Sequence, residues 1–144
     1  MVYAAANQSL AMLEMLVQDQ PLRARYVIIE ARIPAGLAIN RVRIEHLPSD
    51  WREISAREKL RAIGTEWVRR PGTAVLAVPS AIVPAESNYL LNPLHRDFKR
   101  IKIGKPTTVE TDLRLNQTLG VSTIDRVGQR QRFGDFLGTR CEKQ

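Results

Sequence analysis

The stretch from Val75 to His95, VLAVPSAIVPAESNYLLNPLH, constrains the fold more than any other part of this sequence. An apolar run with strand character, Thr73 to Val78, ends at Pro79-Ser80, and a second short apolar run ends at Pro84. A cluster of polar side chains follows among apolar neighbours, namely Glu86, Ser87, Asn88, Asn92 and His95. Ligand sites are commonly built where strands end and hydroxyl and amide groups gather. We therefore expect a functional site at the end of this strand.

The composition is that of one folded domain. The chain has 144 residues, of which 44% are hydrophobic and 26% charged, which is enough apolar material for a core. No apolar run approaches the roughly 18–20 residues of a membrane span, and no secretory signal is evident at the start. A single cysteine and two histidines argue against a disulfide and a zinc site. We expect a cytoplasmic protein that does not act at a membrane, with no metal or cofactor of its own.

The chain carries a formal net charge of +7 and a pI near 10.2. Such a charge attracts anions, which include nucleic acids, nucleotides and acidic proteins. The basic residues are scattered, and no helix-turn-helix signature is present. A solvated basic surface is the first explanation, a site for a phosphate-bearing ligand the second, and direct DNA binding the third.

Periodicity in the first half predicts one helix and three strands. The first five residues read as the end of a strand, and Ser9 to Asp19 as a helix with a broad apolar face. Strict alternation predicts a half-buried strand from Arg25 to Ile33, and a second alternating run extends from Leu37 to Ile44. In the first of these strands, one face carries Val27, Ile29, Ala31 and Ile33.

Further along the chain, Ser55 and Glu58 have the spacing of a capping box, so we expect a helix from there to Arg69. Gly64 inside this helix could break it. The run from Thr73 to Val78 is the most strand-like in the chain, and two short strands are predicted at 95–103 and 107–113. Residues 116–144 are predicted to form a loosely structured tail. Short strands mixed with two helices indicate the α+β class.

Several pieces, in order, resemble the RES-domain family, which is named for Arg, Glu and Ser residues that its members share. The resemblance covers residues 1–115. The pieces are VYAA at Val2–Ala5, LAMLE at Leu10–Glu14, GTEW at Gly64–Trp67, VLAVPS at Val75–Ser80, NYLLNP at Asn88–Pro93 with His95, and DLRL at Asp112–Leu115.

The resemblance implies a toxin of a bacterial toxin–antitoxin pair. The fold would be similar to that of ADP-ribosyltransferases, with a mixed sheet and a few helices. The reaction would break NAD⁺, a substrate rather than a cofactor, at the nicotinamide–ribose bond, with water, phosphate or a protein as acceptor. The partner would be an Xre-type antitoxin that covers the active site, so DNA would be reached only through the antitoxin. Toxins of this kind often pair as homodimers.

The resemblance places Tyr3, Glu14 and Ser80 on active-site positions, together with one of Asn88 and Asn92. The residue types suit the chemistry, because a carboxylate such as Glu14 can stabilise positive charge that develops on the ribose. Ser80 is expected to bond the nicotinamide or ribose, and Tyr3 to stack or donate a hydrogen bond. From pattern alone, each of these residues has an ordinary structural explanation as well: a helix edge, a core aromatic or a turn.

Family members carry a further segment before the Tyr3 strand, with an early arginine and a glycine-rich stretch ending in Arg-Trp-Asn, which this sequence lacks. Such arginines are expected to clamp a pyrophosphate by bidentate contacts. A catalytically dead module that still binds the antitoxin is therefore the alternative function. A small basic nucleic-acid-binding protein, suggested only by the net charge, is a further one.

Overall fold

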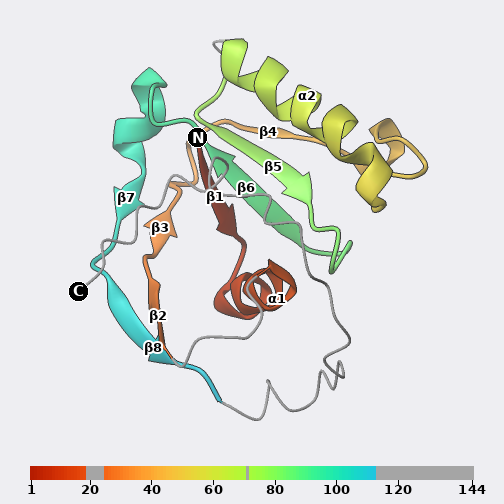
Figure 1. Cartoon of the computed structure of the whole chain (residues 1–144). Helices are drawn as coiled ribbons and strands as arrows, with labels where there is room; N and C mark the ends of the chain where they lie inside the picture. The colour runs from red at the N-terminus through yellow and green to blue at the C-terminus, as the bar shows by residue number, and fades with distance from the viewer. Residues whose placement is uncertain (19–24, 71, 113–144) are drawn as a thin grey trace.

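The computed structural model describes residues 1–18, 25–70 and 72–112. Its centre is a four-stranded sheet in the order β1-β6-β5-β4, accompanied by two helices and two short strand pairs, β2-β8 and β3-β7 (Figure 1). This confirms the α+β class. The elements are β1 (Val2–Ala5), α1 (Gln8–Gln18), β2 (Arg25–Ile28), β3 (Ala31–Arg32), β4 (Ile39–Arg41), α2 (Arg57–Arg69), β5 (Val75–Pro79), β6 (Ser87–Leu91), β7 (Lys102–Ile103) and β8 (Thr107–Glu110), with 3₁₀ turns η1 (Ile44–His46), η2 (Ile54–Ala56) and η3 (Arg96–Arg100).

The sheet is mixed, and β6 lies at its centre. β6 is antiparallel to both β1 and β5, whereas β4 pairs with β5 in parallel. The register places Asn88 opposite Ala5 on one side and opposite Val78 on the other. Because side chains directly opposite each other in a ladder share a face, these three residues project to the same side of the sheet.

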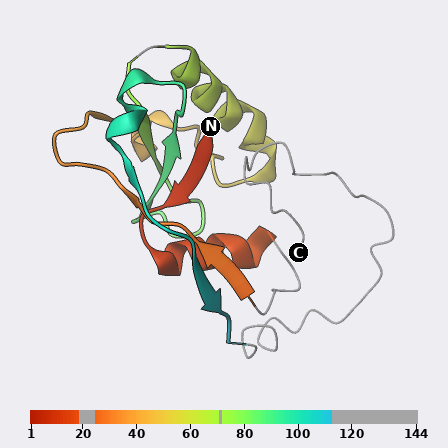
Figure 2. The same ribbon diagram turned by 90° about the vertical axis from the view of Figure 1, so that its left-hand side faces the viewer.

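The two faces of the sheet carry separate apolar clusters. On the face of Asn88, Trp67 from α2 packs with Leu76 and Leu90, and Tyr3 and Val78 border that cluster. On the other face, Val75 and Leu91 are buried together with residues from the connecting segments, which are Leu37, Ala74 and Ile101. In Figures 1 and 2, α2 lies at one end of the molecule and α1, with the β2-β8 ribbon, at the other.

The predicted strand from Arg25 to Ile33 is interrupted in the structure. β2 ends at Ile28 and pairs with β8, and β3 begins at Ala31 and pairs with β7. Ala31 and Ile33 pack against the core as the alternation predicted, but Val27 is 62% exposed and Ile29 is also exposed. The break arises because the two halves pair with different strands.

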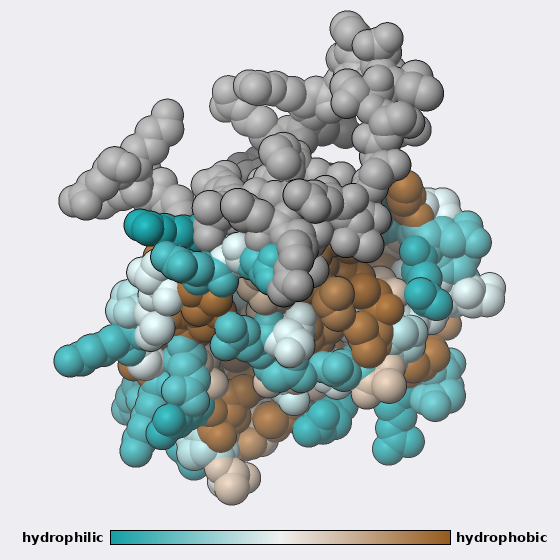
Figure 3. Space-filling model, turned by 90° about the horizontal axis from the view of Figure 1, so that it is seen from below, coloured by the Kyte–Doolittle hydropathy of each residue, from teal (hydrophilic) through white to brown (hydrophobic). Residues whose placement is uncertain are grey.

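Seen from below, apolar side chains emerge on the surface in separate patches between hydrophilic ones (Figure 3).

The predicted capping box is wrong. Ser55 lies inside η2, and α2 begins at Arg57 after Ala56, which offers no side-chain cap. The Ser55 hydroxyl lies near the Glu53 carboxylate instead, at 3.4 Å, and Glu58 pairs with Arg61. The 3₁₀ turn replaces the capping box, because a turn that runs directly into the helix supplies backbone acceptors to the first helical amides.

Two further differences between the sequence predictions and the structure lie in the second half. The segment predicted as a strand at 95–103 is mostly the turn η3, and only Lys102–Ile103 is extended. The central strand β6 was not predicted at all. The helix of Gln8–Gln18 and the strands β1, β5 and β8 are confirmed within a residue or two where the chain is described. The tail predicted for 116–144 lies outside the described residues.

Gly64 does not break α2, which runs through it to Arg69. Gly64 is buried, and a methyl group at this position would meet Leu90 Cδ1 at 3.6 Å, an ordinary van der Waals distance. Alanine is favoured over glycine in a helix interior by about 0.5–1 kcal/mol. We therefore expect Gly64→Ala to raise the free energy of unfolding by about that amount, measured by urea denaturation. A loss of stability would show that α2 and the sheet leave no room for the methyl group.

Candidate active site

Ser80 follows the end of β5 and has its hydroxyl group fixed by three hydrogen bonds. The Oγ atom accepts from the backbone N–H groups of Ile82 and Val83, each at 3.1 Å, and donates to Glu14 Oε1 at 2.9 Å. A hydroxyl has only one hydrogen to donate, so that hydrogen is committed to Glu14. Ser80 is fully buried, with an exposed fraction of 0%.

Asn88, in the central strand β6, holds the same carboxylate oxygen. Its Nδ2 donates to Glu14 Oε1 at 2.6 Å, and the residue is only 1% exposed. The Asn88 nitrogen and oxygen positions cannot be exchanged, because a carboxylate accepts hydrogen bonds and donates none. The other amide atom, Asn88 Oδ1, is buried without a hydrogen-bond partner.

Glu14 reaches these two residues from the middle of α1. Ser80 continues the alternation of β5 two residues after Val78, so Ser80 and Asn88 project to one face of the sheet, where Glu14 meets both. Both donors bind Oε1. Within the described part of the chain no hydrogen bond to Glu14 Oε2 is present.

Tyr3 lies in β1 on the same face, opposite Leu90. Burial and, to a smaller degree, the negative charge of Glu14 raise the pKa of the Tyr3 phenol above its ordinary value. The phenol therefore stays protonated at neutral and mildly alkaline pH. Tyr3 is half-buried, and no hydrogen bond between its hydroxyl group and Glu14 is present. It borders the site as a neutral aromatic donor.

Comparisons with known proteins identify the family of this chain. The RES domain model matches residues 1–115. The chain belongs to the RES domain family. A "Toxin Res" of Photorhabdus laumondii subsp. laumondii is 40% identical over 101 residues, which cover 69% of this chain and 64% of that protein. A "Toxin Res" of Yersinia enterocolitica is 37% identical over 100 residues, covering 68% and 65%.

A third relative, the "Prs ADP-ribosylating toxin" of a Sphingobium strain, is 37% identical over 108 residues, covering 72% of this chain and 67% of that protein. The chain thus spans slightly less than two thirds of the length of the Photorhabdus and Yersinia relatives. The names of these relatives describe toxins. The names of the Photorhabdus and Yersinia relatives do not state a reaction.

Asn92 and His95 do not join Glu14 in this RES domain. Asn92 Oδ1 accepts from the backbone N–H of Leu94 at 3.1 Å. The backbone N–H of Asn92 donates to the carbonyl oxygen of Ala74. His95 Nδ1 accepts from the backbone N–H of Asp97 at 3.1 Å. The two side-chain contacts join residues two positions apart and are turn contacts. Of the two asparagines between which the sequence did not decide, only Asn88 contacts the carboxylate.

From the sequence, Ser80 was predicted to form a hydrogen bond with the nicotinamide or ribose. In the structure its hydrogen goes to Glu14, and its lone pairs accept the N–H groups of the turn that follows. Serine hydroxyls commonly bond backbone amides two or three residues later in a turn. The Pro-Ser-Ala pattern was the signal for this turn, but no signal in it indicated the contact with a helix 66 residues away.

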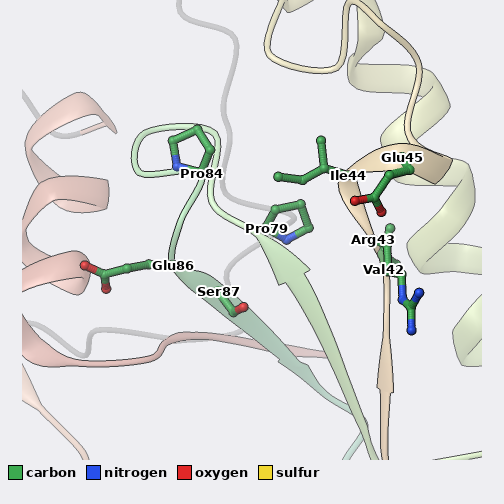
Figure 4. A pocket seen from close by; sticks show the side chains of 8 residues that line it. All are labelled: Val42, Arg43, Ile44, Glu45, Pro79, Pro84, Glu86 and Ser87. Carbon is green, nitrogen blue, oxygen red and sulfur yellow. The ribbon is translucent and has the colours of Figure 1, made fainter.

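Beyond the ends of β4 and β5 the surface carries a shallow hollow of about 400 Å³ (Figure 4). It lies beside the turn that follows Ser80, between Pro84 on one side and Ile44 on the other. Its polar lining consists of Arg43, Glu45, Glu86 and Ser87, so charges of both signs border it.

Other kinds of site find no support in the described ranges. Residues 1–18, 25–70 and 72–112 contain no group of three or more His, Cys, Asp or Glu side chains that could hold a metal ion. Among the same residues, no helix is long and apolar enough to cross a membrane.

Ser80 and Asn88 both donate to Glu14, but removing one or the other should lower the free energy of unfolding by different amounts. Ser80→Ala leaves two backbone N–H groups of a partly buried turn without their acceptor, so we expect a loss of about 1–3 kcal/mol in the free energy of unfolding. Asn88→Leu removes one hydrogen bond together with a buried oxygen that has no partner, so we expect a smaller loss. Urea denaturation of both variants measures the order, and the reverse order would contradict these hydrogen-bond assignments.

Proposed function

We propose that this RES domain is the NAD⁺-consuming part of a bacterial toxin and that it cleaves the bond between nicotinamide and ribose. The observation that carries the proposal is the carboxylate of Glu14, held through Oε1 by Ser80 and Asn88, while Oε2 accepts no hydrogen bond from the described residues. Membership of the RES family and relatives named as toxins support the biological role. One relative's name states an ADP-ribosylating activity for that protein.

The reaction requires stabilisation of positive charge more than it requires acid catalysis. When the C1′–N bond breaks, its electron pair leaves with nicotinamide, which departs as a neutral molecule, and the ribose becomes oxocarbenium-like. A fixed negative charge beside C1′ lowers the energy of that transition state. The acceptor then forms a new bond to C1′ and gives up a proton, which Glu14 can take before passing it to solvent.

Ser80 and Asn88 hold the carboxylate in place for this reaction. Because both donate to Oε1, they restrict the rotation of the carboxylate. We assign Ser80 no nucleophilic role, since its hydrogen is already donated to a carboxylate and no histidine among the described residues contacts it. Tyr3, kept neutral, is proposed to stack on the nicotinamide ring or to donate to the ligand.

The proposal extends to location and partners. A toxin of this family would act in the cytoplasm and be held inactive by an Xre-type antitoxin that covers the Glu14 site. DNA would then be reached only through that antitoxin. Homodimer formation, expected from the family resemblance, stays a prediction. The acceptor is proposed as water, phosphate or a protein, and each gives a different product.

The proposed function is tested by incubating the purified chain with NAD⁺ and measuring nicotinamide release for the wild type and for Glu14→Gln. The substitution keeps an oxygen that accepts from Ser80 and Asn88 but removes the charge, so we expect a fold close to wild type and a loss of about a hundredfold or more in kcat. Glu58→Gln, an exposed carboxylate on α2, is the matched control and should keep full activity.

The same assay distinguishes the acceptors. Water gives ADP-ribose, phosphate gives ADP-ribose 1″-phosphate, and a protein acceptor takes up label from NAD⁺ that carries label in its adenylate part. Release that persists in Glu14→Gln would overturn the assigned role of Glu14. A folded wild-type chain that releases no nicotinamide with any of the three acceptors would overturn the proposed function itself.

A further inference from the structure

The start of α1 is fixed by Asn7, which is its N-cap residue. Asn7 Oδ1 accepts from the backbone N–H of Leu10 at 2.8 Å, and the Asn7 carbonyl oxygen accepts from the N–H of Ala11 at 3.1 Å. These are the two contacts that define a helix N-cap. Glu14 lies about two turns further along the same helix. The position of Asn7 therefore sets where Glu14 meets the sheet.

The other amide atom of Asn7 reaches a distant part of the chain. Asn7 Nδ2 donates to Glu86 Oε2 at 2.7 Å, across 79 positions of sequence. Figure 4 shows the Glu86 side chain, at the edge of the hollow, extending toward α1. The first turn of α1 contains no acidic residue, so the Glu86 carboxylate supplies the negative charge that the N-terminal end of a helix favours.

Glu86 belongs to the segment that carries both donors to Glu14. Its backbone N–H donates to Val83 at 2.8 Å, and its carbonyl oxygen accepts from the N–H of Ser80 at 2.9 Å. Two residues later the chain reaches Asn88. Glu86 is therefore connected to both donors of Glu14. A backbone hydrogen bond connects it to Ser80, and the chain of β6 connects it to Asn88.

We infer that the Asn7–Glu86 hydrogen bond is a positioning link, which aligns α1 with the Ser80 turn so that Glu14 reaches Ser80 and Asn88 together. Asn7 and Glu86 act through Glu14 and are positioning residues. The inference rests on the proposed function for its kinetic consequence. An exposed hydrogen bond of this kind contributes little to stability, whereas a displacement of about 1 Å at a reacting group can reduce the rate a hundredfold.

The test begins with Asn7→Asp. Aspartate caps a helix as well as asparagine does, so α1 keeps its N-cap, but the donor to Glu86 is replaced by a second carboxylate. We expect kcat for nicotinamide release to fall about tenfold or more, with KM changed less than about twofold and the melting temperature little affected. A kcat equal to that of the wild type would overturn the inference.

A polarity swap provides the rescue. In the double variant Asn7→Asp/Glu86→Gln, the amide introduced at position 86 donates to the carboxylate introduced at position 7, so the link is restored in the opposite direction. We expect most of the lost kcat to return. Glu86→Ala should lose more activity than Glu86→Gln, whose oxygen still accepts from Asn7. Glu45→Gln, the other carboxylate beside the hollow, is the matched control. Failure of the double variant to recover would count against the link.

A spectroscopic readout separates this inference from the proposed function. In ¹⁵N-labelled protein, the side-chain amide of Asn88 reports its hydrogen bond to Glu14 whether or not NAD⁺ is turned over. We expect its resonance to shift toward the position of a free amide in Asn7→Asp and to return in the double variant. If the wild type releases no nicotinamide, this pattern still supports the link. An Asn88 resonance that is the same in all three proteins would overturn it.

Discussion

Two hydrogen bonds to one oxygen of Glu14 connect the three parts of this molecule that matter for its site. One comes from Ser80 at the end of β5, and the other comes from Asn88 in the central strand β6. Through them a helix from the first twenty residues is bound to the two inner strands of the sheet, which come from residues 75–91. Both bonds go to the same oxygen, so the contact that joins helix and sheet also fixes the carboxylate of the proposed site.

The arrangement has a cost that argues for function rather than stability alone. Asn88 is almost fully buried, yet its Oδ1 has no partner, and a buried acceptor of this kind reduces stability by about 1–3 kcal/mol. A leucine would fill similar space without the cost but could not donate to Glu14. Local rules of folding are typically broken at functional sites, where the chain accepts a loss of stability for chemistry. The neutral Tyr3 beside the carboxylate fits the same pattern.

Sequence reasoning predicted the parts of this fold that have a clear period. The helix that bears Glu14 was predicted because its apolar residues share one broad face, and β5 was predicted because its residues form a continuous apolar run before Pro79-Ser80. β6 was missed because its outer half, Ser87-Asn88, is polar and reads as a loop. Without β6 there is no register, and only the register reveals that Asn88 lies beside Ser80 while Asn92 does not. The interruption of the strand after Ile28 depends on partner strands at least 70 residues away, which no local pattern contains.

The most direct test of the central claim is a crystal structure of Glu14→Gln with NAD⁺ bound, since this variant should bind the substrate without consuming it. The account predicts the ribose C1′ atom next to the free end of the side chain at position 14, with Ser80 and Asn88 still bonded to its other end. The nicotinamide ring should lie against Tyr3. A nicotinamide ribose bound elsewhere, such as in the hollow between Ile44 and Pro84, would contradict the claim that Glu14 is the catalytic carboxylate.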